Sequence, residues 1–160
     1  MSQGKTAFES LLARFTAAVE NADRAGFAAL FTDDAEYHDG VFGMVIGGKA
    51  IGDMMVDLWW RDARNYKWTM FEAVESGGIG YAHYYFSFDS LMKHSTGKHV
   101  VFKGVSQFRL RDGKICGYQE WGDSLPSYVQ LGVPGDILVR SGNKKADEYK
   151  KDPAVIARHL

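Results

Sequence analysis

The chain has 160 residues and a mass of 17.9 kDa, a length that suits one compact domain. Its 19 Lys and Arg nearly balance its 20 Asp and Glu, so the formal net charge of −1 disfavours nucleic acid, whose partners need a basic excess. No apolar run approaches the ~18 residues that cross a bilayer. The charged N-terminal segment predicts no signal peptide, and the single cysteine, Cys116, fits a reducing cytoplasm. We therefore expect a cytoplasmic protein with neither a membrane nor a nucleic-acid partner.

The first third of the chain has helical patterning. Thr6 and Glu9 form a capping box, and apolar residues follow at helical spacing, which predicts a helix over residues 6–22. Asp23 can cap a short second helix. Residues 35–39 read as a short strand that enters a glycine-rich turn, and the apolar spacing of residues 51–59 predicts a third helix ending near Asn65.

The pattern then changes to strands. Residues 67–76, 81–90, 99–110 and 114–121 read as strands, with Asp112-Gly113 as a hairpin turn between the last two. Helices followed by antiparallel strands predict an α+β domain, in which three helices cover a curved sheet shaped like a cone. We expect residues 1–123 to form this domain and residues 124–160 to form a tail that packs on the cone or on a partner subunit.

Several short segments resemble a known superfamily. They include residues 14–23, 29–35, Gly48-Lys49-Ala50-Ile51 and Glu120-Trp121-Gly122-Asp123. In these residues the chain is similar to the NTF2-like superfamily, and most of all to ketosteroid isomerases and SnoaL-like polyketide cyclases. The resemblance covers roughly residues 6–132 and implies the cone-shaped α+β barrel. It does not fix the reaction, because this scaffold hosts isomerases, dehydratases, cyclases, epoxide hydrolases and transport factors.

Asp39 is the first candidate catalytic residue. The resemblance places it where the ketosteroid isomerases carry a general base, and a carboxylate facing an apolar cavity is well suited to accept a proton. The alternative is that Asp39-Gly40 only forms a turn. The same register puts Phe15 and Ser106 at the two oxyanion-hole positions of those isomerases, where Phe15 cannot donate and a serine donates weakly.

Strand alternation predicts which side chains face the inside of the cone. If Ser106 points inward, the neighbouring strands contribute mostly aromatic side chains and one amide. The predicted substrate-binding residues are Phe15, Tyr37, Phe86, Phe88, Phe102, Ser106, Phe108, Gln119 and Trp121.

Three further residues are candidates for the chemistry. Asp123 occupies a position similar to the acid/base aspartate of SnoaL-like cyclases, although it could instead cap a helix in the tail. Tyr84 could donate to a developing oxyanion or be a core tyrosine with a satisfied hydroxyl. His38 alternates with Asp39 and so favours the surface, unless the following turn brings it to the open end of the cone.

No motif indicates a metal or a cofactor. The five histidines lack ligand spacing, and neither GxGxxG nor a P-loop occurs. We therefore expect a cofactor-independent isomerase, cyclase or lyase for a small apolar carbonyl compound. The alternatives are a non-catalytic binding or adaptor protein and a related dehydratase or hydrolase. Polar and aromatic side chains on the outer sheet face, such as Tyr81 and Tyr85, favour a homodimer.

Overall fold

The architecture is that of a computed structural model, which describes residues 6–40 and 42–159. Helix α1 (Ala7–Glu20) begins at the expected capping box, in which Thr6 and Glu9 bond each other's backbone. Asp23 caps α2 (Arg24–Ala29) by accepting a hydrogen bond from Gly26 N–H at 2.9 Å. Helix α3 (Gly48–Met54) continues through a π-helical turn, η1 (Met55–Trp59), into α4 (Trp60–Asp62).

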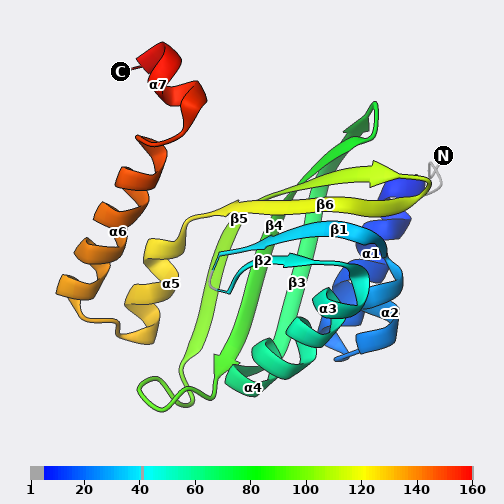
Figure 1. Ribbon diagram of the computed structural model, residues 1–160. Coiled ribbons are helices and arrows are strands. Elements are labelled where there is room, and N and C mark those ends of the chain that lie inside the picture. The colour runs from blue at the N-terminus through cyan, green and yellow to red at the C-terminus, as the bar shows by residue number, and fades with distance from the viewer. Residues whose placement is uncertain (1–5, 41, 160) are drawn as a thin grey trace.

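Six strands form one curved sheet in the order β2-β1-β6-β5-β4-β3 (Figure 1). They are β1 (Phe31–Asp39), β2 (Gly43–Ile46), β3 (Ala63–Ser76), β4 (Ile79–Ser90), β5 (His99–Arg111) and β6 (Lys114–Gly122). The α+β class is confirmed, but not every pairing is antiparallel, because β1 and β6 run parallel. Strand β2 was not expected, because its residues were read as part of the glycine-rich turn. Strand β1 begins at Phe31, four residues earlier than expected.

A bulge at Cys116 interrupts the β5–β6 hairpin. Leu110 pairs with Ile115, but Arg109 pairs with Gly117, so Cys116 has no partner across the ladder. One extra residue reverses the alternation of every residue that follows it on the strand. Consequently Ser106 pairs with Glu120, whereas an uninterrupted hairpin would place Gln119 opposite it.

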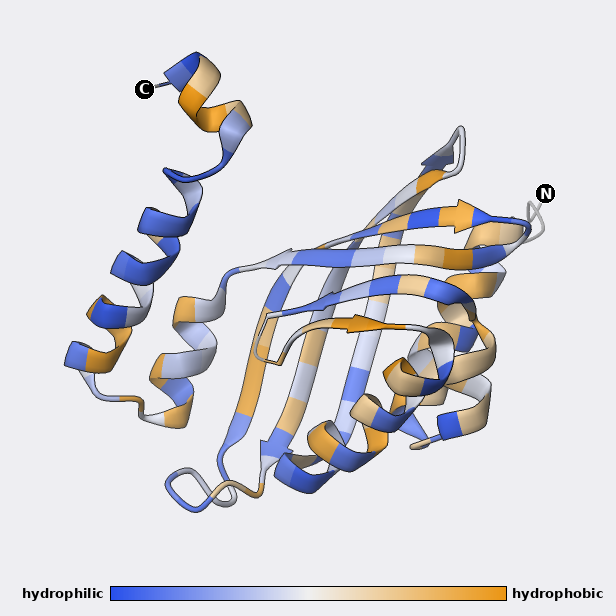
Figure 2. Ribbon diagram, in the orientation of Figure 1, coloured by the Kyte–Doolittle hydropathy of each residue, from blue (hydrophilic) through white to orange (hydrophobic). Residues whose placement is uncertain are grey.

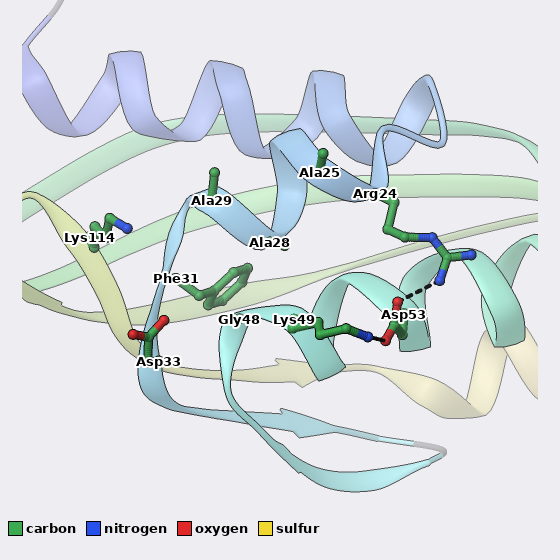
Figure 3. A pocket seen from close by; sticks show the side chains of 10 residues that line it. All are labelled: Arg24, Ala25, Ala28, Ala29, Phe31, Asp33, Gly48, Lys49, Asp53 and Lys114. Atoms are coloured by element: carbon green, nitrogen blue, oxygen red, sulfur yellow. Dashed lines mark hydrogen bonds and ion pairs between the residues drawn. The ribbon is translucent and has the colours of Figure 1, made fainter.

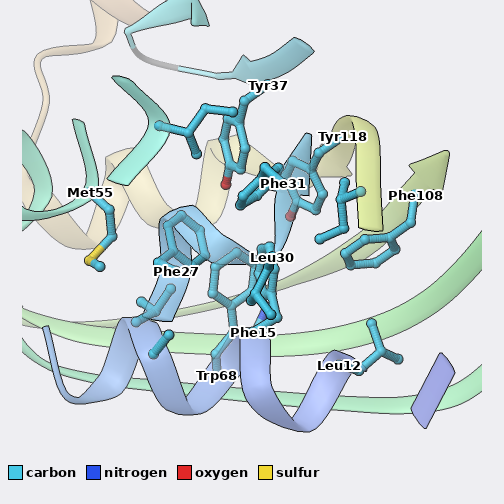
Figure 4. Packing of buried hydrophobic residues seen from close by; sticks show 14 of the residues in the cluster. Leu12, Phe15, Phe27, Leu30, Phe31, Tyr37, Met55, Trp68, Phe108 and Tyr118 are labelled. Carbon is cyan, nitrogen blue, oxygen red and sulfur yellow. The ribbon is translucent and has the colours of Figure 1, made fainter. Parts of the chain in front are cut away.

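The helices and the inner sheet face enclose an aromatic core. Phe15 of α1 is fully buried and contacts the rings of Phe27, Trp68, Phe108 and Tyr118 at centroid distances of 5.0 to 5.5 Å (Figure 4). Such edge-on and tilted pairs add to the stabilisation from burial itself. We call this packed region, Phe15, Phe27, Phe31, Phe108 and Ile115, the closed end of the cone.

The tail forms three helices. Helix α5 (Ser124–Leu131) lies along β5 beyond the end of β6, where the Gln130 side chain bonds both the N–H and the carbonyl of Val101, at 3.0 and 2.8 Å. The amide of Gln130 therefore replaces a missing strand neighbour. Helices α6 (Gly135–Tyr149) and α7 (Pro153–His159) extend away from the sheet, and α6 is largely hydrophilic (Figure 2). Among the described residues, no helix combines the length and apolarity needed to span a membrane.

Candidate functional site

The parallel pairing of β1 and β6 brings two acids together. Tyr37 of β1 pairs with Tyr118 of β6, and their rings stack with centroids 4.5 Å apart. Two residues further along each strand, on the same inner face, the side chains are Asp39 and Glu120. The charge of Asp39 is one of the causes that raise the pKa of Glu120, which places the two carboxyl groups in electrostatic contact. We call Asp39 and Glu120 the acid pair.

Glu120 is positioned to hold a proton near neutral pH. Desolvation by burial, reinforced by the negative charge of Asp39, raises its pKa to about 7. The Tyr118 hydroxyl donates to Glu120 Oε2 at 3.0 Å, and Ser106 Oγ lies 2.9 Å from the same hydroxyl. This hydrogen bond favours the ionised carboxylate and so limits the rise. In the described part of the chain, no Lys, Arg or His forms an ion pair with Glu120.

Asp39 is held by donors on both of its oxygens. The backbone N–H of Phe42 donates to Oδ1 at 2.8 Å, and the indole Nε1 of Trp59 donates to Oδ2 at 3.2 Å. Trp59 is the last residue of η1, and its carbonyl accepts the Tyr66 hydroxyl at 2.8 Å. A single π-helical turn inside a helix is common at functional sites, and here it ends at the tryptophan that orients Asp39. The two donors fix the orientation of the Asp39 carboxyl group.

Tyr84 reaches the acid pair across two strands. Its hydroxyl fills a notch at the cross-strand pair Gly104 and Gly122, where an added Cβ would lie 2.5 and 2.8 Å from the oxygen. Burial and the charge of Glu120 raise the pKa of Tyr84 well above its ordinary value. The hydroxyl is buried, and Glu120 is its polar neighbour; the two groups interact, but among residues 6–40 and 42–159 the hydroxyl makes no well-aligned hydrogen bond.

Aromatic side chains complete this end of the cone. Phe86 packs on Trp68 with centroids 4.7 Å apart and on Phe102 at 5.3 Å. Phe86, Phe88, Phe102 and Trp59 are half-buried, in contrast to the fully enclosed rings of the closed end. We call the region formed by the acid pair with Trp59, Tyr84, Phe86 and Phe102 the acid end of the cone.

The structure separates the predicted residues into three groups. Tyr37, Asp39, Tyr84, Phe86, Phe88 and Phe102 surround the acid end or lie directly beneath it. Phe15, Ser106 and Phe108 are fully buried and belong to the core. His38 is exposed on the outer sheet face, 3.9 Å from Glu36.

The predicted inward residues of β6 need correction. Gln119 and Trp121 alternate with the inward Tyr118 and Glu120, and Trp121 is 53% exposed. Asp123 is exposed at the N-cap position of α5, although its side chain makes no capping bond there. The physical reason is the bulge at Cys116, which turns Glu120, rather than Gln119, toward the inside.

The sequence missed Glu120, Tyr118 and Trp59 as site residues. Glu120 and Tyr118 could have been found only by anticipating the bulge, for which Gly117, a glycine inside the strand directly after Cys116, is a sequence signal. For Trp59, the Trp59-Trp60 pair was visible, but a regular helix does not indicate which indole faces Asp39. In the structure the π-helical turn ends at Trp59, whose indole bonds Asp39. The indole Nε1 of Trp60 instead donates to the Val19 carbonyl at 3.0 Å.

A separate groove lies outside the cone, between α2, α3 and the start of β1 (Figure 3). Its volume is about 500 Å³, and its floor is formed by small side chains such as Ala25 and Ala28. Two of the cations that line it, Arg24 and Lys49, both pair with Asp53, at 2.5 and 2.6 Å. Within the described residues, no group of three His, Cys, Asp or Glu is arranged to hold a metal ion.

Comparison with known proteins places this fold and these strands in a family. Residues 12–118 match the SnoaL-like domain. No curated protein sequence matches the chain.

Three solved structures illustrate the likeness in fold. A protein with a ketosteroid isomerase-like fold from Catenulispora acidiphila, in complex with trimethylamine, aligns at TM-score 0.70 and 18% identity over 79% of this chain and 95% of its own.

The other two structures carry different activities in their names. A putative SnoaL-like polyketide cyclase from Shewanella putrefaciens aligns at TM-score 0.69 and 14% identity, over 82% of this chain and 100% of its own. An LEH-like epoxide hydrolase from M. tuberculosis aligns at TM-score 0.63 and 16% identity, over 76% of this chain and 82% of its own. At such identities the likeness shows a shared fold and leaves the reaction open. On the match of residues 12–118, the chain belongs to the family of proteins with a SnoaL-like domain.

Proposed function

We propose that the protein is an enzyme that transfers protons on a small, largely apolar, carbonyl-bearing molecule, as a cyclase, isomerase or lyase does, and that it needs no cofactor. One observation carries this proposal: Glu120, a half-buried acid whose pKa is raised to about 7, lies beside Asp39, whose two carboxyl oxygens each accept a hydrogen bond. Two neighbouring acids in different environments are the usual arrangement for coupled acid and base catalysis.

The environments of the two acids assign their roles. Asp39, oriented by Trp59 and the backbone N–H of Phe42, removes a proton from the carbon next to the substrate carbonyl. Glu120, protonated, donates to the carbonyl oxygen as the enolate forms, and Tyr84 adds to this polar wall. In an isomerisation Asp39 then returns its proton to a different carbon. In a cyclisation the enol carbon instead attacks a second carbonyl carbon of the same molecule, the C=O π bond opens, and Asp39 gives its proton to the resulting alkoxide. In both cases Glu120 recovers its own proton from the enol oxygen. Protons are conserved over the cycle.

Replacement of Asp39 tests the assignment of the base. We expect Asp39→Asn to slow proton–deuterium exchange next to the carbonyl, across a panel of apolar ketones and esters, by about a hundredfold or more. Asp34→Asn is the matched control, because Asp34 lies on the same strand but pairs with Arg111 at the surface. The base assignment fails if Asp39→Asn and wild type exchange at equal rates.

A non-catalytic binding protein is the second candidate, and the packing of the closed end favours it. Phe15, Ser106 and Phe108 are fully buried, so the deep part of the cone is filled by the protein's own side chains. A binding protein would retain its ligand in Asp39→Asn and would show no exchange in either form. The same panel, measured for both binding and exchange, distinguishes the two candidates.

The proposed enzyme is a homodimer that buries the outer face of the sheet. Tyr81, Tyr85 and Val101 are 39 to 53% exposed on this face, and Phe71 stacks on Tyr85 with centroids 5.0 Å apart. An apolar sheet face of this kind marks a protein contact. Light scattering should give twice the mass of 17.9 kDa, and the monomer mass would contradict the dimer.

A further inference from the structure

At the acid end, no Lys, Arg or His of the described residues forms an ion pair with Glu120. The inward side chains beside the acid pair are uncharged and mostly aromatic, among them Tyr37, Trp68, Tyr84, Phe86, Phe102 and Tyr118. The basic residues of these strands, including His38, Lys67 and Lys103, are exposed on the opposite face. The charged groups that influence Glu120 and the three neighbouring tyrosines are the acid pair and no cation.

Aromatic side chains link the two acids into a ring. From Asp39 the contacts run through the Trp59 indole, then to Trp68 with centroids 6.4 Å apart, and on to Phe86 at 4.7 Å. Phe86 contacts Phe102 at 5.3 Å, and Phe102 contacts Tyr84, which interacts with Glu120. Aromatic faces attract cations and offer no stabilisation to anions.

The Tyr84 hydroxyl is a further sign that this end is built to receive a ligand. Tyr84 is 1% exposed, and in the described part of the chain its hydroxyl interacts with Glu120 but makes no well-aligned hydrogen bond. Buried polar groups are nearly always bonded, and the exceptions are frequent at functional sites. The Gly104 and Gly122 pair keeps this hydroxyl next to Glu120.

We propose that the acid end selects its ligand by charge. It accepts an apolar ring that carries an ammonium group most tightly, a neutral ring less tightly, and rejects the same ring with a carboxylate or phosphate. The inference deepens the proposed function, since it concerns the same site. It implies that the substrate arrives as an amine or a neutral compound, and not as a free acid or a phosphate ester.

The charge of the ligand should be linked to the protonation of Glu120. A bound cation favours the ionised carboxylate, and a bound anion favours the protonated acid. The affinity for an ammonium ligand should therefore rise with pH through about 7, where Glu120 ionises, and binding near that pH should release protons. Asp39, Tyr37, Tyr66, Tyr84 and Tyr118 are the other titratable groups that face this end.

Binding of matched probes tests the proposal without any turnover. Benzylamine, benzyl alcohol and benzoate differ mainly in charge, and at about pH 8 the amine is still protonated. The indole N–H signal of Trp59, one of four tryptophans, reports binding in a proton–nitrogen NMR titration, because it donates to Asp39. We expect benzylamine to bind at least about tenfold more tightly than benzoate, with benzyl alcohol between them.

Two variants locate the effect. Glu120→Gln should reduce the preference for benzylamine over benzoate by about tenfold. Glu36→Gln is the control, because it removes a carboxylate of β1 that pairs with Arg109 on the outer face, and it should leave the preference unchanged. Benzoate binding as tightly as benzylamine, or no shift of the Trp59 signal with benzylamine, would overturn the proposal. Exchange activity that survives such a result would leave the proposed function intact, because that function requires the acids and not charge selection.

Discussion

The two ends of the cone are built from the same strands but differ in what they can do. At the closed end, β5 and β6 contribute Phe108 and Ile115, which are fully buried against α1. At the acid end, β1 and β6 contribute Asp39 and Glu120, which are half-buried and surrounded by incompletely covered rings. Aromatic packing is thus continuous along the strands. The core ends and the candidate site begins where the inward residues change from the tyrosines Tyr37 and Tyr118 to the acids Asp39 and Glu120.

This contrast shows how little sequence is needed to convert a core into a site. Tyr37 and Tyr118 stack on each other, and the next inward residue on each strand is an acid. The tyrosines beneath the acid pair exclude water, which raises the pKa of Glu120, and the Tyr118 hydroxyl limits the rise by donating to it. The layer of Tyr37 and Tyr118 beneath the acid pair therefore helps to keep Glu120, the proposed proton donor, out of water.

Truncation of a ring should have its largest effect at the closed end. Phe15→Ala leaves a cavity among four aromatic neighbours and should lower the free energy of unfolding by about 4 kcal/mol. Phe102→Ala removes a half-buried ring and should cost about 2 kcal/mol or less. Denaturant unfolding measures both. Equal losses at the two positions would contradict the difference between the ends.

Neutralising Glu120 should change the pH dependence of stability. The folded protein holds the Glu120 proton up to about pH 7, whereas the unfolded chain releases it near pH 4.5, so wild-type stability falls as the pH rises between these values. The glutamine of the Glu120→Gln variant cannot ionise, so the variant should not show this fall in stability as the pH rises. Relative to wild type, the variant should gain about 3 kcal/mol between pH 4 and pH 8.

The control for that measurement is Glu36→Gln, whose carboxylate is exposed and paired with Arg109 on the outer face. It should show the same pH dependence as wild type in thermal or denaturant unfolding. A pH-independent difference between Glu120→Gln and wild type would mean that Glu120 ionises alike in the folded and unfolded chains.

The cost of adding a side chain at Gly122 should come from the Tyr84 hydroxyl alone. A Cβ at Gly122 would lie 2.8 Å from that oxygen and 3.8 Å from its other close neighbours, so Gly122→Ala should destabilise the fold by about 1 kcal/mol. Adding Tyr84→Phe removes the clashing atom and should restore most of the loss in a double-mutant cycle. Additive effects of the two substitutions would place the hydroxyl elsewhere.

Local patterns predicted much of the fold but only half of the acid pair. The capping box at Thr6 and the hairpin at Asp112-Gly113 depend on neighbouring residues, so they were readable in the sequence. Asp39 was identified through a family resemblance. Glu120 was not, because its direction depends on the bulge at Cys116 and its partner on the parallel pairing of β1 with β6, both of which are set by tertiary packing.

The tail shows the opposite outcome. Helix α7 begins at Pro153, whose fixed φ suits the first position of a helix. Helix α6 was not expected from the sequence, and it buries none of its residues. Its apolar residues Ile137, Leu138 and Val139 lie near its start and the remainder is mostly polar or charged, so no core-facing stripe marked it as a helix.

The protonation of Glu120 is the central claim, and carbon NMR of its side-chain carboxyl tests it most directly. The signal that disappears in Glu120→Gln identifies the group, and its shift is followed from acid to alkaline pH. The account predicts a midpoint near 7, which Asp39→Asn lowers by removing the neighbouring negative charge. A midpoint near 4.5, unaffected by Asp39→Asn, would show a solvated acid and contradict the proposed site.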